Sequence, residues 1–143
     1  RRQFELHQTV NTQDVENAVW HYLCVSKIDG VKAAQKLFIK ITSDLRVPLK
    51  ETHALFAGKG TEQQVLDAIK SGDPTPTALA RNQFYGHLYL GLYFEAQGNA
   101  EKAADYITKA AKGHEAHGYM GQVARVHHEW LQKKAKQKTE KAK

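Results

Sequence analysis

Hydrophobic residues along most of this chain recur at intervals of three and four positions, the spacing that places them on one face of a helix. Between residues 13 and 26, for example, the apolar positions are Val15, Ala18, Val19, Tyr22, Leu23 and Val25. No segment alternates between hydrophobic and polar residues for long enough to indicate a sheet strand. The pattern therefore predicts an all-α protein.

Capping and turn residues divide this pattern into successive helices. Asn11 or Thr12, Thr61, Thr77 and Asn99 stand where N-caps are expected, and Thr61 opens a capping-box sequence. We expect helices at residues 1–8, 13–26, 31–41, 48–58, 61–70, 78–97 and 100–112, and a last one from 118 into the C-terminal lysines. The first reads as the end of a helix whose beginning is missing, so the chain is expected to start within a repeat.

A specific spacing of small and large residues stands between residues 87 and 110. A Leu-Gly pair is followed by an aromatic residue, a turn glycine, and then alanine, a large apolar residue and alanine: Leu90, Gly91, Phe94, Gly98, Ala103, Ile107 and Ala110. This spacing resembles the tetratricopeptide (TPR) repeat, in which small residues let two helices cross closely. His87 stands where the repeat has a larger residue, and the period of roughly 34 residues is not maintained along the chain.

The resemblance implies a TPR-like α-α superhelix of about three antiparallel helical hairpins and a closing C-terminal helix. Residues 1–132 would form this single domain, and residues 133–143 a lysine-rich helical extension or a loose tail. No hairpin of this kind can bury its apolar face alone, so the stacking of neighbours would make the core.

The layout between residues 10 and 130 resembles one family in particular. The resemblance rests on Trp20-His21-Tyr22-Leu23, on the short hairpin around Phe56 and Val65-Leu66, on the stretch from Asn82 to Gly91, and on the last helix with Arg125. These segments are similar to the middle and C-terminal part of the NlpI-type bacterial TPR lipoproteins. That family implies a non-enzymatic, often dimeric adaptor of the bacterial cell envelope, which brings peptidoglycan hydrolases together with a tail-specific protease. Its membrane attachment would need an N-terminal lipid anchor, and this sequence shows no targeting signal.

The predicted helix 78–97 carries more aromatic residues than one buried stripe needs: Phe84, Tyr85, Tyr89, Tyr93 and Phe94. In TPR hairpins the first helix lines the concave groove. By repeat position, the residues that would face a partner there are Tyr85, Leu88, Leu92 and Glu95, with core packing as the alternative for each. Tyrosine combines a flat apolar ring with a polar tip, which suits protein contacts. The sequence therefore favours a scaffold that binds a peptide or a partner helix.

The positive charge of the chain is concentrated at its ends. Of the formal net charge of +6, the six lysines and one glutamate of residues 133–143 supply most, while residues 9–132 are balanced. The alternative function is therefore an accessory contact of the lysine-rich tail with nucleic acid or a membrane surface. The neutral body makes nucleic acid the less favoured partner, and no stretch approaches the roughly 18 apolar residues of a membrane span.

No motif for catalysis or for a cofactor stands out. His114 and His117 are one residue too close for the zinc motif H-E-x-x-H, and no cysteine lies near them. Cys24 sits between Leu23 and Val25 and is expected to be a buried, inert thiol. We therefore expect no enzymatic activity, no catalytic residues, no metal ligands and no cofactor.

Overall fold

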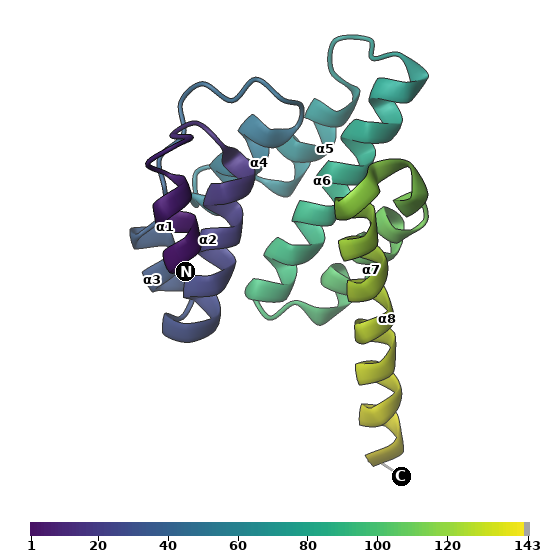
Figure 1. Cartoon of the computed structure of the whole chain (residues 1–143). Helices are drawn as coiled ribbons and strands as arrows, with labels where there is room; N and C mark the ends of the chain where they lie inside the picture. Colours follow the sequence, from purple (N-terminus) through teal and green to yellow (C-terminus); the bar gives the residue numbers. More distant parts are fainter. Residues whose placement is uncertain (142–143) are drawn as a thin grey trace.

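The computed structural model describes residues 1–141, without the side chains at positions 114, 138, 139 and 141. Within that range the protein is all-α, as predicted, and has no strand (Figure 1). Its elements are α1 (Arg2–His7), α2 (Val15–Asp29), α3 (Val31–Lys36), α4 (Leu49–Phe56), α5 (Glu62–Lys70), α6 (Pro76–Ala96), α7 (Ala100–Ala111), the 3-10 helix η1 (His114–His117) and α8 (Gly118–Lys141). The lysine-rich end up to Lys141 continues α8, and residues 142–143 lie outside the described part.

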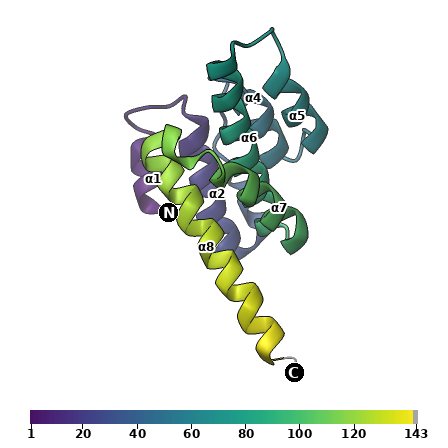
Figure 2. The ribbon, with the colours of Figure 1, turned by 90° about the vertical axis from the view of Figure 1, so that its right-hand side faces the viewer.

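Consecutive helices pack against each other as antiparallel neighbours. The pair α6 and α7 shares the largest interface, while α2 packs on α3, α4 on α5 and α8 on α7. The helices α2, α4 and α6 also contact one another directly. Figures 1 and 2 show α8 running along the body and then projecting beyond it toward the C-terminus.

The helices α6 and α7 cross closely at Gly91. A Cβ atom at this position would lie 2.7 Å from the side chain of Ile107 and 3.0 Å from its backbone nitrogen, so only glycine fits without displacement. Leu90, Ala103, Ile107 and Ala110 are all buried around this crossing. Phe94 is half-buried and stacks on Tyr106, and Gly98 makes the following turn with a φ of 79°.

An aromatic cluster forms the centre of the core where α2, α4 and α6 meet. Tyr22 and Phe56 are fully buried, and their ring centroids lie 5.0 Å apart in an edge-to-face arrangement worth about 0.5–1.5 kcal/mol beyond burial. Burial raises the pKa of Tyr22 to about 12. The Tyr22 hydroxyl accepts a hydrogen bond from Gln97 Nε2 at 3.3 Å. The cluster thus ties α2 to α4 and to the end of α6.

The helix ends agree with the capping residues at some positions and differ at others. Thr61 makes the predicted capping box with Gln64, and Asn99 caps α7, so both predictions are confirmed. Asp14, not Asn11 or Thr12, caps α2, because its carboxylate accepts from the backbone N–H of Glu16. Thr75 replaces Thr77 as the cap of α6, since Pro76 suits the first helical turn.

The helix predicted at residues 31–41 is wrong beyond Lys36. From Leu37, with φ −95° and ψ 8°, the chain leaves the helix and runs without regular structure to Pro48. Long-range contacts outcompete the helix here: Phe38 stacks on His53 with centroids 4.7 Å apart, and Gln13 Oε1 accepts the backbone N–H groups of Thr42 and Ser43 at 2.8 and 3.0 Å. This segment therefore belongs to the surface of α2 and α4.

Arg46 fixes the end of this segment on the first turn of α2. Its guanidinium donates to Glu16, Asp14 and Asp44 at 2.7, 2.8 and 2.6 Å. Asp44 also accepts the backbone N–H of Val15 at 3.2 Å, and its side chain is only 4% exposed. Burial alone would raise the pKa of Asp44, but the hydrogen bonds from Arg46 and Val15 outweigh it and lower that pKa.

The crossing at Gly91 predicts a sharp steric cost. We expect Gly91→Ala to lower the free energy of unfolding by about 1–3 kcal/mol, because the backbone of Ile107 cannot move away from the new methyl group without displacing α7. Gly113→Ala is the matched control, since its Cβ would meet nothing within 4 Å and its φ of −109° suits alanine. Urea unfolding followed by circular dichroism measures both. Equal stability of the two variants would contradict the close approach of α7 to Gly91.

The buried Asp44 carboxylate predicts a pH-dependent contribution to the free energy of unfolding. We expect Asp44→Asn to destabilise the protein by about 1–3 kcal/mol at neutral pH, because the buried charged hydrogen bonds are lost. The folded pKa lies below the ordinary value of about 3.8, so this stabilisation is present above 3.8 and disappears as the pH falls through the folded pKa. Urea unfolding at a series of pH values should show the deficit shrinking in acid. The exposed Asp67→Asn variant should show no comparable deficit at any pH.

Candidate functional site

An open groove lies between three helices that are far apart in the sequence: the C-terminal half of α2, the last turn of α6, and α8. It holds about 660 Å³, within the roughly 300–1,000 Å³ typical of ligand-binding clefts. Its walls are mostly apolar: Trp20, Leu23, Cys24, Ser26, Lys27, Leu92, Glu95, Ala96, Val123, Val126, His127 and Trp130. We call this surface the α2/α6/α8 groove.

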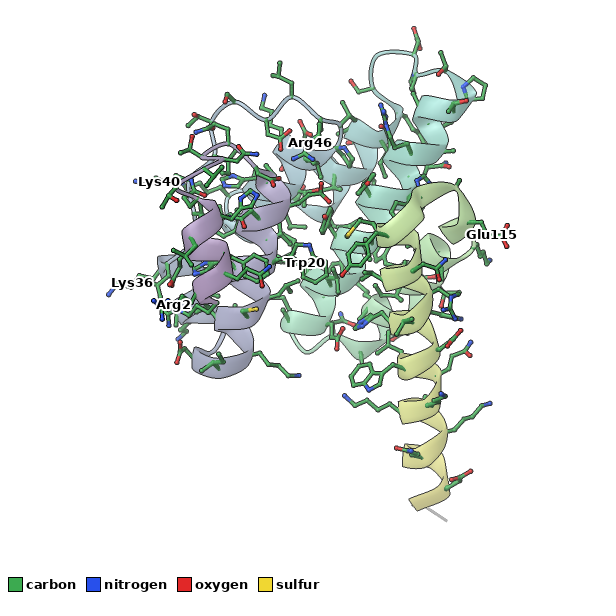
Figure 3. The ribbon with its side chains drawn as sticks, viewed as in Figure 1. Arg2, Trp20, Lys36, Lys40, Arg46 and Glu115 are labelled. Atoms are coloured by element: carbon green, nitrogen blue, oxygen red, sulfur yellow. The ribbon has the colours of Figure 1, made fainter. Side chains whose placement is uncertain are left out.

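The helix α2 carries apolar residues on two faces, and only one face enters the core. Val19 and Tyr22 are fully buried, whereas Trp20 and Leu23 are partly exposed and line the groove. Figure 3 shows Trp20 in the space between α2 and α8. The groove is therefore a second apolar surface of α2, separate from its packing face.

The helix α8 leaves large apolar side chains open to solvent on the groove side. Ala124 is fully buried, but Val126 is 54% and Trp130 is 44% exposed. The apolar residues of this helix thus divide into a part that packs on the body and a part that stays open. Exposed apolar side chains that gather in one cleft are typical of a surface that contacts another molecule.

A hydrogen bond between a histidine and a carboxylate joins α6 to α8 within the groove. His127 Nε2 donates to Glu95 Oε2 at 2.6 Å, and the imidazole stacks on Trp130 with centroids 5.6 Å apart. The hydrogen bond from His127 holds the pKa of Glu95 below its ordinary value against the effect of burial, and the charges of Lys27 and Lys134 act in the same direction. Two of the three walls are therefore linked by a contact that a ligand would meet directly.

The structure separates the four residues predicted to bind a partner. Leu92 and Glu95 line the groove, although Leu92 is only 6% exposed. Leu88 does not face an open surface: its exposure is 0% because α2 and α6 enclose it in the core. A partner cannot reach Leu88 in this arrangement, and truncating it to alanine would instead create a cavity costing about 2–5 kcal/mol.

Tyr85 lies at a different and more polar depression, beside the segment that holds Arg46. This depression has a volume of about 770 Å³ and includes Arg81 and Asn82 from α6. Burial and then the charge of Glu16 raise the pKa of Tyr85. Arg46 in this depression already forms ion pairs with three carboxylates, so its charge is not available to a ligand. Tyr85 therefore does not share a surface with Leu92 and Glu95.

Sequence reasoning missed the residues that dominate the groove: Trp20, Val126 and Trp130. One signal was present, because the chain has two tryptophans and both fall outside the repeat pattern of residues 90–110. Cys24 was expected in the core, but it is only partly buried and lines the groove. Trp20 and Cys24 were missed because α2 was assigned a single apolar face, and Val126 and Trp130 because the exposure of α8 depends on how other helices pack against it.

The histidines occupy separate places. His117 stacks on Phe84 with centroids 3.9 Å apart, and burial lowers its pKa. His128 shares a hydrogen bond with Thr108 at 3.2 Å, and the side chain of His114 lies outside the described residues. Among the side chains that the structure describes, no three His, Cys, Asp or Glu residues lie close enough to hold a metal ion.

Comparisons with known proteins give no match from which a function could be inferred. No family model matches the chain, and no curated protein or solved structure shows significant similarity to it. None of the described helices is both long enough and apolar enough to cross a membrane. The function of the groove therefore has to be inferred from its own residues.

The position of Cys24 can be tested by alkylation. We expect iodoacetamide to modify this single cysteine in the folded protein, although more slowly than in urea, because the thiol lies on the wall of an open groove. Intact-mass measurements over time give both rates. A thiol that reacts only after unfolding would place Cys24 in the core and contradict the described groove wall.

Proposed function

We propose that this chain is a non-enzymatic scaffold that binds a partner protein in the α2/α6/α8 groove. One observation carries the proposal: large apolar side chains from α2 and α8 face an open cleft, with Val126 and Trp130 about half exposed. Tryptophan is enriched among the residues that dominate binding energy at protein interfaces. Covering these side chains would remove apolar area from water at little cost to the existing core.

We also propose that the helices form a TPR-like superhelix. The hairpins would be α2 with α3, α4 with α5, and α6 with α7, and α8 would close the array. The contacts of α2, α4 and α6 with one another support this arrangement, as does the close crossing at Gly91. The groove then lies on the face formed by the first helix of each hairpin, although the short α4 does not contribute to it.

The shape of the site favours a helix or a short peptide as the bound segment. The described residues offer no strand edge to which a partner strand could be added. The groove instead presents side chains from three helices, and an amphipathic helix can insert its apolar face among them. A scaffold of this kind acts by raising the local concentration of its clients for one another. The role as a cell-envelope adaptor, which links hydrolases to a protease, is a proposal based on the sequence resemblance alone.

A selection experiment tests the groove. Trp-free helical peptides from a display library are selected on the wild-type protein and then measured on Val126→Asp and Tyr119→Asp. Both residues are exposed on α8, but only Val126 lines the groove. We expect Val126→Asp to weaken binding by at least about tenfold, because the bound apolar face would bury an unpaired charge. Tyr119→Asp should bind like the wild type.

The intrinsic fluorescence gives a direct readout, since both tryptophans of the chain line the groove. A peptide bound there should shift their emission, and unchanged circular dichroism should show that each variant is folded. Selected peptides that bind Val126→Asp as tightly as the wild type, without a change in emission, would refute the groove as the binding site.

A further inference from the structure

We infer that the partner segment is an amphipathic helix with acidic residues beside its apolar face, held by Lys27 and Lys134 at the mouth of the α2/α6/α8 groove. The inference rests on the proposed function, because it specifies the partner of the same groove. It adds a charge requirement that the apolar walls alone do not impose.

The charges around the groove are predominantly positive. Glu95 is the one carboxylate among the lining residues, and His127 already engages it at 2.6 Å. Lys27 is exposed on the wall that α2 provides. Lys134 lies over the Trp130 ring on α8, with its Nζ 4.8 Å from the ring centroid. Within the described residues, neither lysine forms an ion pair.

Lys27 and Lys134 both affect the Glu95 carboxylate, although they come from helices far apart in the sequence. After the hydrogen bond from His127, the charges of these two lysines help to keep the pKa of Glu95 low. Lys27 lines the wall formed by α2, and Lys134 lies over Trp130 on the wall formed by α8, so the two cations stand on opposite walls of the groove. An acidic side chain that arrives there would not have to break an existing ion pair of either lysine.

The course of the helices explains why this end is positive. The helices α2 and α8 run toward the same end of the molecule, and α8 continues past the groove (Figure 1). Its exposed continuation carries Lys133, Lys134 and Lys136. A second copy of the chain would bring an equally basic end to this mouth, so charge repulsion disfavours it as the occupant. A partner with carboxylates is favoured by the same charges.

The apolar walls argue for a protein helix. A nucleic acid would use the lysines and leave Val126 and Trp130 uncovered. A cleft of about 660 Å³ accepts several large side chains and not an entire helix, so one face of the partner would insert. The acidic residues would then lie along the edge of that face, within reach of the two lysines.

Two synthetic peptides test the charge requirement. Both are Trp-free helices of about 18 residues with the same leucine-rich face, and they carry either glutamates or lysines at both ends. Charge at both ends makes the result independent of the direction in which the helix binds. We expect the glutamate peptide to bind the wild type about tenfold more tightly in ~0.1 M salt, measured by the emission of Trp20 and Trp130. The preference should shrink in ~1 M salt.

A matched pair of charge reversals separates the mouth of the groove from the general charge of the protein. The double variant Lys27→Glu/Lys134→Glu should lose or invert the preference for the glutamate peptide. Lys36→Glu/Lys40→Glu changes the net charge equally, but Figure 3 shows both residues at the outer edge of the molecule, away from α8. This control should retain most of the preference. An equal loss in both double variants would overturn the inference.

The remaining outcomes distinguish the two proposals. Equal affinity of the two peptides, with both losing affinity on Val126→Asp, would leave the proposed function standing and refute the charge requirement. Failure of both peptides to bind, or binding that ignores Val126→Asp, would refute the groove itself and this inference with it. A DNA duplex whose binding requires Lys134 but not Val126, and which displaces the glutamate peptide, would identify nucleic acid as the ligand and overturn the inference.

Discussion

The direct contact between α2 and α6 is the constraint on which the rest of the structure depends. The Tyr89 hydroxyl donates to Glu16 Oε1 at 2.5 Å, which joins residues 73 positions apart, and burial together with the Glu16 charge raises the pKa of Tyr89 well above its ordinary range. A second hydrogen bond, between Gln97 at the C-terminal end of α6 and Tyr22 of α2, joins the same two helices further along their length. A hydrogen bond to a charged group, such as that from Tyr89 to the Glu16 carboxylate, contributes about 1.5–3 kcal/mol.

This contact also determines which side chains are core and which are surface. Leu88 is enclosed in the core that α2 and α6 share with other helices, and Glu16 of α2 is held by Arg46 in the segment after α3. The C-terminal half of α2 then faces α8 across the open cleft, with Trp20 between them. The groove is thus a consequence of the same packing that forms the core, because one side of α2 packs in the core and another side forms the wall of the groove.

The sequence predicted the features that depend on neighbouring residues. It did not predict helix ends and side-chain exposure that depend on contacts with residues distant in the chain. The capping box at Thr61 and the small residue Gly91 could be identified because their chemistry is local and their spacing is fixed. The helix beyond Lys36 was overpredicted, because local periodicity cannot reveal that Gln13 captures the backbone of Thr42 and Ser43. Two of the four residues predicted to contact a partner line the groove for the same reason. Leu92 and Glu95 follow from position within one helix, whereas the burial of Leu88 and the exposure of Trp130 depend on how other helices pack.

A groove whose walls come from α2, α6 and α8 couples binding to folding. The α6 and α8 walls are linked by Glu95 and His127, while α2 reaches α8 only across the cleft. A segment that fills the cleft would contact α2 and α8 at once, and so would add to the links that Tyr89 and Gln97 already make between the early and late parts of the chain. Because it would bind the folded state alone, it would stabilise the whole array by mass action, in proportion to the logarithm of its concentration relative to Kd. The unoccupied scaffold is therefore expected to be the less rigid form, and a partner would complete its packing as well as attach to it.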